Sequence, residues 1–400
     1  MNHRLPLLFI LVTLAIDAMG IALVVPVMPS LIQELDGGSI SQAALWGGIL
    51  SASYAIMQFL CGPLLGSLSD RYGRRPVLLV TLTVMSLDYL LLASASSVWW
   101  LLAGQIIGGI ASSTRSVATA FVADISEPSE KAARFGLVGA AFGVGFVIGP
   151  VLGGALATID TQAPFYAAAG IAAINLAFGF AILPETVTDR IRRPFSWKQA
   201  NPLGALLDLG TRPGLKQLVA MFFLYQVAFF VYPAVWAYFA EARFGWSPYM
   251  IGISLALFGT ALAVIQGGLI RVILKHLGDR GTVIYGLAFN ACAFVALAFV
   301  TSGTMALILT PFAALGAVVI PALQAIMSRT IPDNAQGSLQ GLLTSAGALS
   351  MVISPVLMTQ IFWLFTAEST GIYLPGAPFL LSMALMGACA VVFLTRGRDA

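Results

Sequence analysis

Long apolar runs separated by short polar segments extend along the whole chain. A helix that crosses the roughly 30 Å hydrocarbon layer of a bilayer needs about 20 mostly apolar residues. Twelve segments meet this requirement: 5–33, 43–67, 76–96, 98–124, 132–158, 164–184, 215–240, 249–274, 281–301, 304–328, 336–366 and 372–395. The pattern predicts an all-α membrane protein with twelve transmembrane helices. The longest polar interruption, a cytoplasmic central loop at 185–214, divides it into an N-terminal half (1–184) and a C-terminal half (215–400).

The composition agrees with lipid as the main solvent. Of the 400 residues, 59% are hydrophobic and 9% are charged, whereas soluble domains carry about a quarter charged residues. The net charge of +3 is too small to indicate a nucleic-acid partner. Cys61, Cys292 and Cys389 lie in apolar stretches without the spacing of a zinc site, so we expect neither a metal site nor a disulfide.

Lysine and arginine are unevenly distributed between the loops. With the N-terminus inside the cell, the cytoplasmic segments hold nearly all of them, and the outer loops hold only Arg243. Loops rich in positive charge stay in the cytoplasm. We therefore expect both termini to be cytoplasmic.

The two halves repeat each other weakly. VIGPVL at 147–152 matches VISPVL at 352–357, an offset of 205 residues. At the same offset Gly73 falls on Gly278, and Arg75 falls on Arg280. This predicts a duplicated six-helix unit, and paired six-helix halves are a transporter architecture. The alternative is coincidence among glycine-rich helices.

Three formally charged side chains lie deep inside predicted spans: Asp17, Asp88 and Arg115. Each is about 16–18 Å from the inner end of its helix, at 1.5 Å per residue. A charge at this depth is costly and usually faces the protein interior or an ion path. Burial favours a neutral carboxyl and a nearby guanidinium favours the ionised form, so this set can form a proton-coupling site. The alternative is structural: hydrogen bonds to neighbouring helices, with Arg115 neutralising one aspartate.

The inner loop after the second span reads GSLSDRYGRRP. We expect one glycine to allow close helix approach, another to permit a tight turn, and the carboxylate to pair with a helix end. The spacing resembles the signature of the major facilitator superfamily, which implies a cytoplasmic gate. The candidate gating residues are Gly66, Asp70, Arg71, Gly73, Arg74 and Arg75.

The fifth span contains GAAFGVGFVIGPVLGG. Small residues allow close helix packing, and a proline bends a helix. The stretch resembles the superfamily's antiporter motif, which is associated with exporters, although a glycine-rich membrane helix can also be a simple packing face. The candidate motif residues are Gly139, Gly143, Gly149, Pro150 and Gly153.

Several longer stretches resemble the tetracycline–proton antiporters of Gram-negative bacteria, including DAMGIALVVPVMPSL, SLDYLLLA and FVADISEPSEKAARFG. The resemblance runs along essentially the whole chain, and it implies that Asp17 and Asp88 are important for transport. Two departures concern the drug and the coupling. Asn290 stands where the family has a ninth-span aspartate. The position that matches the family's eighth-span histidine is at about Leu262.

The seventh span is rich in aromatic residues that can line a cavity for a flat, partly apolar molecule, although aromatic residues at helical spacing more often serve packing. Together with polar positions of the C-terminal half, they provide the candidate substrate-binding residues Gln226, Phe229, Asn290 and Gln324.

These features predict a bacterial inner-membrane exporter that exchanges protons for a small amphiphilic drug, with tetracycline as the leading candidate. Alternatives are an exporter of another drug or metabolite, a proton-coupled uptake symporter of the same fold, and a non-transporting sensor. No nucleotide-binding loop or catalytic triad is apparent. We expect no enzymatic activity and no cofactor, and a functional monomer.

Overall fold

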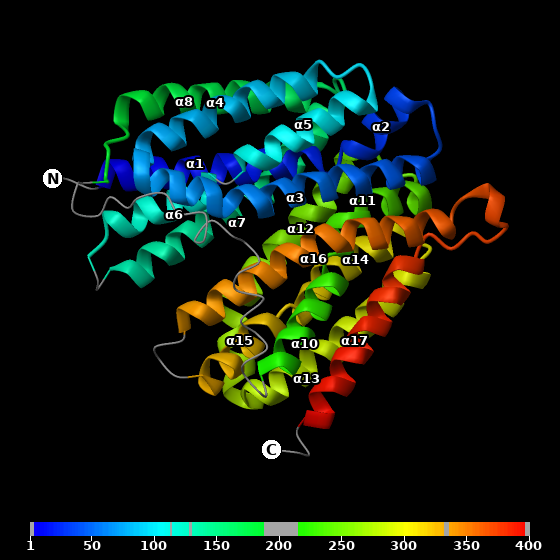
Figure 1. Cartoon of the computed structure of the whole chain (residues 1–400). Coiled ribbons are helices and arrows are strands. Elements are labelled where there is room, and N and C mark those ends of the chain that lie inside the picture. The colour runs from blue at the N-terminus through cyan, green and yellow to red at the C-terminus, as the bar shows by residue number, and fades with distance from the viewer. Residues whose placement is uncertain (1–3, 113, 128–129, 188–214, 332–335, 397–400) are drawn as a thin grey trace. The chain divides into compact units, whose positions relative to one another are not determined.

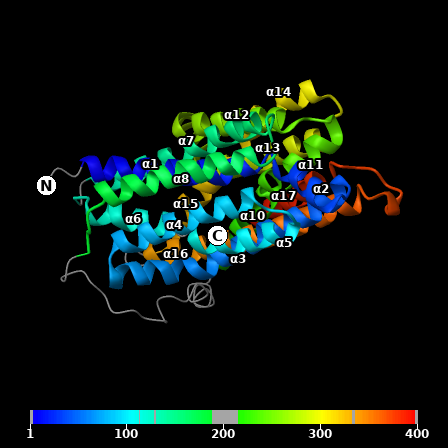
Figure 2. The same ribbon diagram turned by 90° about the horizontal axis from the view of Figure 1, so that it is seen from above.

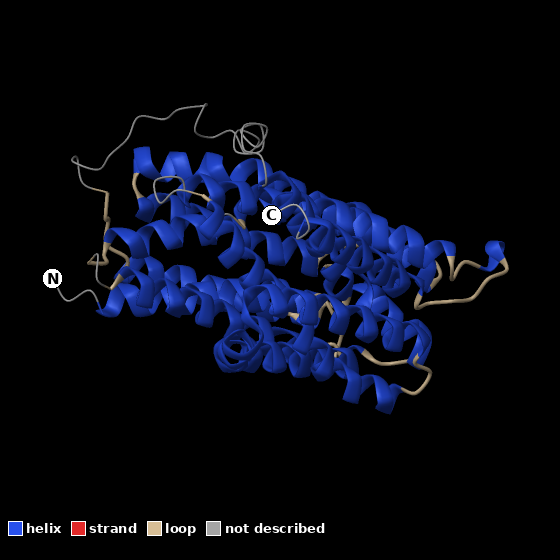
Figure 3. Cartoon of the chain, turned by 90° about the horizontal axis from the view of Figure 1, so that it is seen from below, coloured by secondary structure: helices blue, strands red, loops and turns tan. Residues whose placement is uncertain are grey.

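The computed structural model describes residues 4–112, 114–127, 130–187, 215–331 and 336–396. Side chains at positions 4, 115, 132, 133, 337, 338 and 396 lie outside this description. Most of the predicted central loop, 188–214, also lies outside it. The described residues form helices joined by turns and loops, with no strand among them (Figure 3).

Eleven described helical segments are long and apolar enough to cross a membrane. One of them, Pro248–Phe299, has 52 residues, or about 78 Å at 1.5 Å per residue, more than twice the hydrocarbon thickness. Gly278 inside it has φ 64° and ψ 177°, a conformation that essentially only glycine adopts. This segment is therefore two spans, and the expectation of an all-α protein with twelve transmembrane helices is confirmed.

The helices of the N-terminal half (Figure 1) are α1 (Arg4–Val24), α2 (Met28–Asp36), α3 (Ile40–Tyr72), α4 (Arg74–Ala93), α5 (Val98–Ala111), α6 (Thr114–Asp124), α7 (Lys131–Leu156) and α8 (Ala163–Ile182). Those of the C-terminal half are α10 (Leu215–Phe229), α11 (Val231–Phe244), α12 (Pro248–Val264), η2 (Ile265–Leu269), α13 (Ile270–Phe299), α14 (Gly303–Ala313), η3 (Ala314–Gly316), α15 (Val319–Thr330), α16 (Gln336–Leu364), η5 (Glu368–Thr370) and α17 (Ala377–Arg396).

Contacts divide the chain into two compact units. One contains 1–37, 53–202 and 247–256, and the other contains 38–52, 203–246 and 257–400. The N-terminal parts of α3 and α12 are thus grouped apart from the rest of their sequence halves. The six-and-six division of the chain stays a prediction.

Four spans that the hydropathy pattern predicts as continuous are interrupted. They are the first (α1 and α2), the fourth (α5 and α6), the seventh (α10 and α11) and the tenth (α14, η3 and α15). Pro26 lies in the first of these turns, and Pro321 lies in the first turn of α15, where its missing N–H costs least. Discontinuous spans often form the binding site of a transporter because they expose backbone groups there.

The backbone carries the same repeat as the sequence. Gly73 and Gly278, 205 residues apart, both have positive φ values, of 111° and 64°, and each precedes the helix of a corresponding span. Pro150 and Pro355, also 205 residues apart, lie inside α7 and α16. These matches support an internal duplication.

In the N-terminal half, α1 packs between α7 and α8, and α4 lies beside α8 (Figure 2). An apolar core of the N-terminal half includes Phe9, Ile10 and Leu14 of α1 and Phe121 of α6. In the C-terminal half, α13 packs along α17 and α15. These packed helices position the polar groups described next.

Candidate functional site

Both predicted membrane carboxylates are buried. Asp17 of α1 is 7% exposed and Asp88 of α4 is 4% exposed. The Asp88 carboxyl group lies against α5, where a Cβ placed on Gly108 would be 2.7 Å from Oδ2 and one on Gly104 would be 3.3 Å from Oδ1. Oδ1 has no hydrogen-bond partner among the described residues. Glycines in the last two turns before the break in the fourth span thus make room for a buried acid.

Two tyrosines, which the sequence analysis did not single out, lie close to this acid site. A Cβ placed on Gly108 would be 3.5 Å from Cε2 of Tyr54 in α3, and Tyr89 of α4 directly follows Asp88. The Tyr89 hydroxyl lies against Gly20, three residues after Asp17. The only signal in the sequence was that Tyr89 directly follows Asp88. Arg115, the third residue of the predicted proton-coupling site, is the second residue of α6, and its side chain lies outside the described part of the structure.

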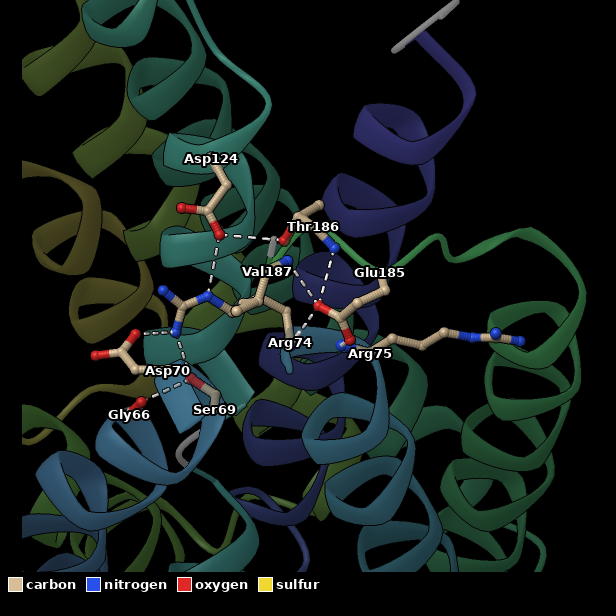
Figure 4. Close-up of polar contacts among 9 residues, drawn as sticks. All are labelled: Gly66, Ser69, Asp70, Arg74, Arg75, Asp124, Glu185, Thr186 and Val187. Atoms are coloured by element: carbon tan, nitrogen blue, oxygen red, sulfur yellow. Dashed lines mark hydrogen bonds and ion pairs between the residues drawn. The ribbon is translucent and has the colours of Figure 1, made fainter. Parts of the chain in front are cut away.

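A second polar cluster lies in the GSLSDRYGRRP stretch, where α3 ends and α4 begins (Figure 4). The Arg74 guanidinium forms an ion pair with Asp70 and another with Asp124, the latter at 3.1 Å from Nε to Oδ2. It also donates to the Ser69 hydroxyl. The end of α3, the start of α4 and the end of α6 are therefore joined by one side chain, which is 10% exposed.

Glu185, just after α8, caps the N-terminus of α4. Its carboxylate accepts from the backbone N–H groups of Arg74 at 2.9 Å and Arg75 at 3.2 Å, and also from those of Thr186 and Val187 (Figure 4). Two arginines at a helix N-terminus oppose the helix dipole, and a carboxylate there is favourable. Sequence reasoning missed Glu185 and Asp124 because Arg74, the partner they share, lies 111 and 50 residues away along the chain, respectively.

The other candidate gating residues have separate roles. Gly73 makes the predicted tight turn, and Arg75 donates to the Phe180 carbonyl at 2.9 Å. The exposed Arg71 guanidinium lies 5.1 Å from the Tyr72 ring centroid. The predicted close helix approach at Gly66 is wrong for this structure, because a Cβ placed there meets no described atom within 4 Å.

The C-terminal half has a corresponding ion pair with the charges exchanged. Arg329 at the end of α15 contacts Asp279 of α13 at 2.6 Å. These positions lie 205 residues after Asp124 and Arg74, respectively. Asp279 directly follows Gly278, so here the acid itself stands at the helix start, where it is favourable.

The glycines of the antiporter motif divide into two groups. A Cβ on Gly149 or Gly153 of α7 would come within 3 Å of the α1 carbonyl oxygen of Met19 or Leu23, respectively, which confirms close packing there. Gly145, which was not in the predicted set, packs in the same way. For Gly139 and Gly143, close packing is not observed, because a Cβ would meet nothing described within 4 Å. Pro150 lies inside α7 as predicted.

The predicted substrate-binding residues of the C-terminal half differ in exposure. Gln226, Phe229 and Gln324 are half-buried, whereas Asn290 is fully buried and hydrogen-bonded to backbone carbonyls. Phe229 stacks on Tyr225 with ring centroids 5.7 Å apart. The buried seventh-span aromatic residues are engaged in packing, so a cavity role stays a prediction for the half-buried ones.

Within the described part of the chain, no group of three or more histidine, cysteine, aspartate or glutamate side chains is arranged to hold a metal ion. The cysteines described there are free: Cys61, Cys292 and Cys389.

The chain is similar to known transport proteins along most of its length. The sequence profile of the Major Facilitator Superfamily matches residues 10–355. The chain is 41% identical to the tetracycline resistance protein, class C, of Escherichia coli, covering 90% of this chain and 91% of that one. It is 39% identical to the class G protein of Vibrio anguillarum, covering 88% and 89%. The crystal structure of the nucleoside transporter NupG superimposes with a TM-score of 0.80 at 12% identity, covering 99% of each chain.

Proposed function

The chain belongs to the major facilitator superfamily of membrane transporters, and from this premise we propose that it is a proton-coupled exporter of a small amphiphilic drug. Tetracycline is the leading substrate, and the bacterial inner membrane is the location. The observation that carries the proposal is the buried pair Asp17 and Asp88 in a chain that matches tetracycline resistance proteins over about nine-tenths of its length.

The chemistry of coupling follows from the surroundings of the acids. A carboxyl group buried in an apolar environment favours its neutral form, and entry of water favours the ionised form. Asp88 lies against glycines of the broken fourth span, where a small helix movement changes its access to water. We assign proton binding and release to Asp17 and Asp88, with Arg115 as the neutralising base.

The Arg74 cluster gives the N-terminal half a rigid inner end. Ion pairs and the Glu185 cap tie α3, α4, α6 and the segment after α8 together, so that these helices move as one body during alternating access. The role of Asp70, Arg71 and Arg75 in holding the two halves together at the cytoplasmic side stays a prediction.

Inverted membrane vesicles with an imposed proton gradient test this function. Accumulation of tetracycline that requires the gradient and the wild-type protein supports export. Accumulation only when the gradient is reversed indicates an uptake symporter, and failure for tetracycline and a broad drug panel contradicts drug export. A susceptibility panel in an efflux-deficient host separates tetracycline from other drugs.

A further inference from the structure

The break in the tenth span is held by a side chain of the ninth. η3 separates α14 from α15, and a helix break frees backbone carbonyl groups that need a protein donor inside a bilayer. The Asn290 amide nitrogen donates to the Gly316 carbonyl at 2.8 Å and to the Gly286 carbonyl of its own helix at 2.9 Å. One amide group therefore links α13 to the point where the tenth span changes course.

Tyr225 of α10 reaches the same carbonyl. Its hydroxyl donates to the Gly316 carbonyl at 3.4 Å and accepts from the Asn290 amide at 3.3 Å. The Tyr225 ring stacks on Phe229, the last residue before the break in the seventh span. The contacts of Asn290 thus extend from one interrupted span to the other.

Glycines make this contact possible. A Cβ placed on Gly316 would lie within 3 Å of the amide atoms of Asn290, and a Cβ on Gly286 would lie 2.5 Å from Val319 Cγ2. Asn290 is 0% exposed and Tyr225 is 1% exposed. A side chain on either glycine would therefore collide with the residues that form this contact.

We infer that Asn290 is a positioning residue, which fixes the break in the tenth span through an uncharged donor, rather than a ligand of the substrate. Two carbonyl oxygens face its nitrogen, so the site requires hydrogen-bond donors. A protonated carboxyl can supply one, whereas a carboxylate supplies none and directs its charge at two oxygens. The inference rests on the proposed function only for its effect on export, because the position of the break is a property of the fold.

The first test is the melting temperature of purified Asn290→Asp in detergent as a function of pH. Below about pH 4 the new acid is protonated in either state, and the variant should then melt close to the wild type. As the pH rises the folded state must keep a proton that the unfolded state releases, so the deficit should grow, to about 3–5 °C or more at pH 8. A deficit that does not change with pH, or no deficit, overturns the inference.

Asn175→Asp is the matched control, because it places the same acid at another buried amide. Asn175 is 2% exposed and contacts the Thr13 hydroxyl at 3.2 Å. A hydroxyl can donate to a carboxylate, whereas a carbonyl cannot. The pH-dependent loss of melting temperature should therefore be smaller for Asn175→Asp than for Asn290→Asp. An equal loss would mean that burial of a charge alone explains the effect, and it would overturn the inference. Asn290→Leu should melt below the wild type at every pH, with no added pH dependence.

A double-mutant cycle tests the contact itself. Gly316→Ala should lower the melting temperature in the wild-type background, because its methyl group collides with the Asn290 amide, and should cost much less in Asn290→Ala. Additive shifts would contradict the contact. Gradient-driven tetracycline accumulation by Asn290→Asp should be retained better at acidic than at alkaline pH. If the melting results hold but no variant, wild type included, transports tetracycline, the positioning role stands and the proposed substrate fails.

Discussion

The two halves place a polar side chain of similar size on corresponding spans, but with different chemistry. In the N-terminal half Asp88 of the third span faces glycines of the interrupted fourth span, and its Oδ1 has no partner within the described residues. In the C-terminal half Asn290 of the ninth span faces Gly316 in the interrupted tenth span. Its amide nitrogen donates to the Gly316 carbonyl, while its Oδ1, like that of Asp88, has no partner within the described residues. The two positions differ by about one helical turn in the repeat register.

This difference separates a group that can exchange a proton from one that cannot. A carboxyl group changes charge with its access to water, whereas an amide keeps the same donors at every physiological pH. If Asp88 binds and releases a proton as proposed, the same fold holds a titrating site in one half and an uncharged hydrogen-bond donor in the other. The ion pairs Arg74–Asp124 and Arg329–Asp279 also differ between the halves, with the positions of acid and base exchanged.

The largest effect is expected from making the first half resemble the second. Asp17→Asn should abolish gradient-driven drug accumulation in inverted vesicles, because the amide keeps the shape of the acid but cannot carry a proton. Asp88→Asn should also be impaired. Asp36→Asn, at an exposed carboxylate, is the control. Full transport by Asp17→Asn, with normal membrane insertion, would contradict the assignment of Asp17 to the proton site.

The ion pairs predict the next difference. Arg74→Ala leaves Asp70 and Asp124 without their guanidinium partner and should reduce the free energy of unfolding by about 2–4 kcal/mol. Arg329→Ala removes the corresponding pair, in which the arginine is 73% exposed, and should cost about 0–1 kcal/mol. Denaturation in detergent measures both, and equal costs would show that burial does not distinguish the loops.

Helix packing predicts a smaller asymmetry. Gly149→Ser should cost about 1–3 kcal/mol, because its Cβ would lie 2.5 Å from the Met19 carbonyl oxygen. The corresponding position of the second half, Ser354, already donates to the Val227 carbonyl at 2.8 Å. Ser354→Gly should lose only that bond and some helix propensity, about 1–2 kcal/mol. A well-tolerated Gly149→Ser would mean that α1 and α7 separate easily.

The glycine beside the acid predicts a further effect. Gly108→Ala places a methyl group against the Asp88 carboxyl group, at 2.7 Å from Oδ2. Gly143→Ala meets open space and gains helix propensity, about 1 kcal/mol. Relative to this control, Gly108→Ala should be less stable by about 1–2 kcal/mol and should transport more slowly. Equal melting temperatures and transport rates would count against the tight packing of Asp88.

The C-terminal half should contribute no proton to the number of protons exchanged per drug molecule. With an amide at position 290, the deep ionisable residues predicted from the sequence all belong to the N-terminal half, and one proton per drug is expected. Export of a neutral drug would then move net charge inward and be assisted by the membrane potential, whereas export of a monocation would be electroneutral. Proteoliposomes in which the pH gradient and the potential are varied independently measure this ratio. A value of two or more would show that another group titrates.

Much of the fold could be predicted because lipid imposes one strong constraint on the sequence. Apolar length marked all twelve spans, and the turn at Gly73 followed from glycine's conformational freedom. The breaks in four of the spans could not be predicted in the same way, because each interrupted segment is still apolar enough on average to be counted as one span. The roles of Glu185 and Asp124 could not be predicted, because no local sequence pattern indicates which residue an acid next to a loop will contact.

The sequence by itself determined the class of protein, the buried acids Asp17 and Asp88, and the repeat of 205 residues, because hydropathy and spacing are properties of the chain alone. Only the tertiary structure decided which groups meet. It placed Glu185 on the start of α4 and Asn290 on the break at Gly316. Hydrogen bonds act over about 3 Å, and residues distant in sequence come within that range only when the helices pack.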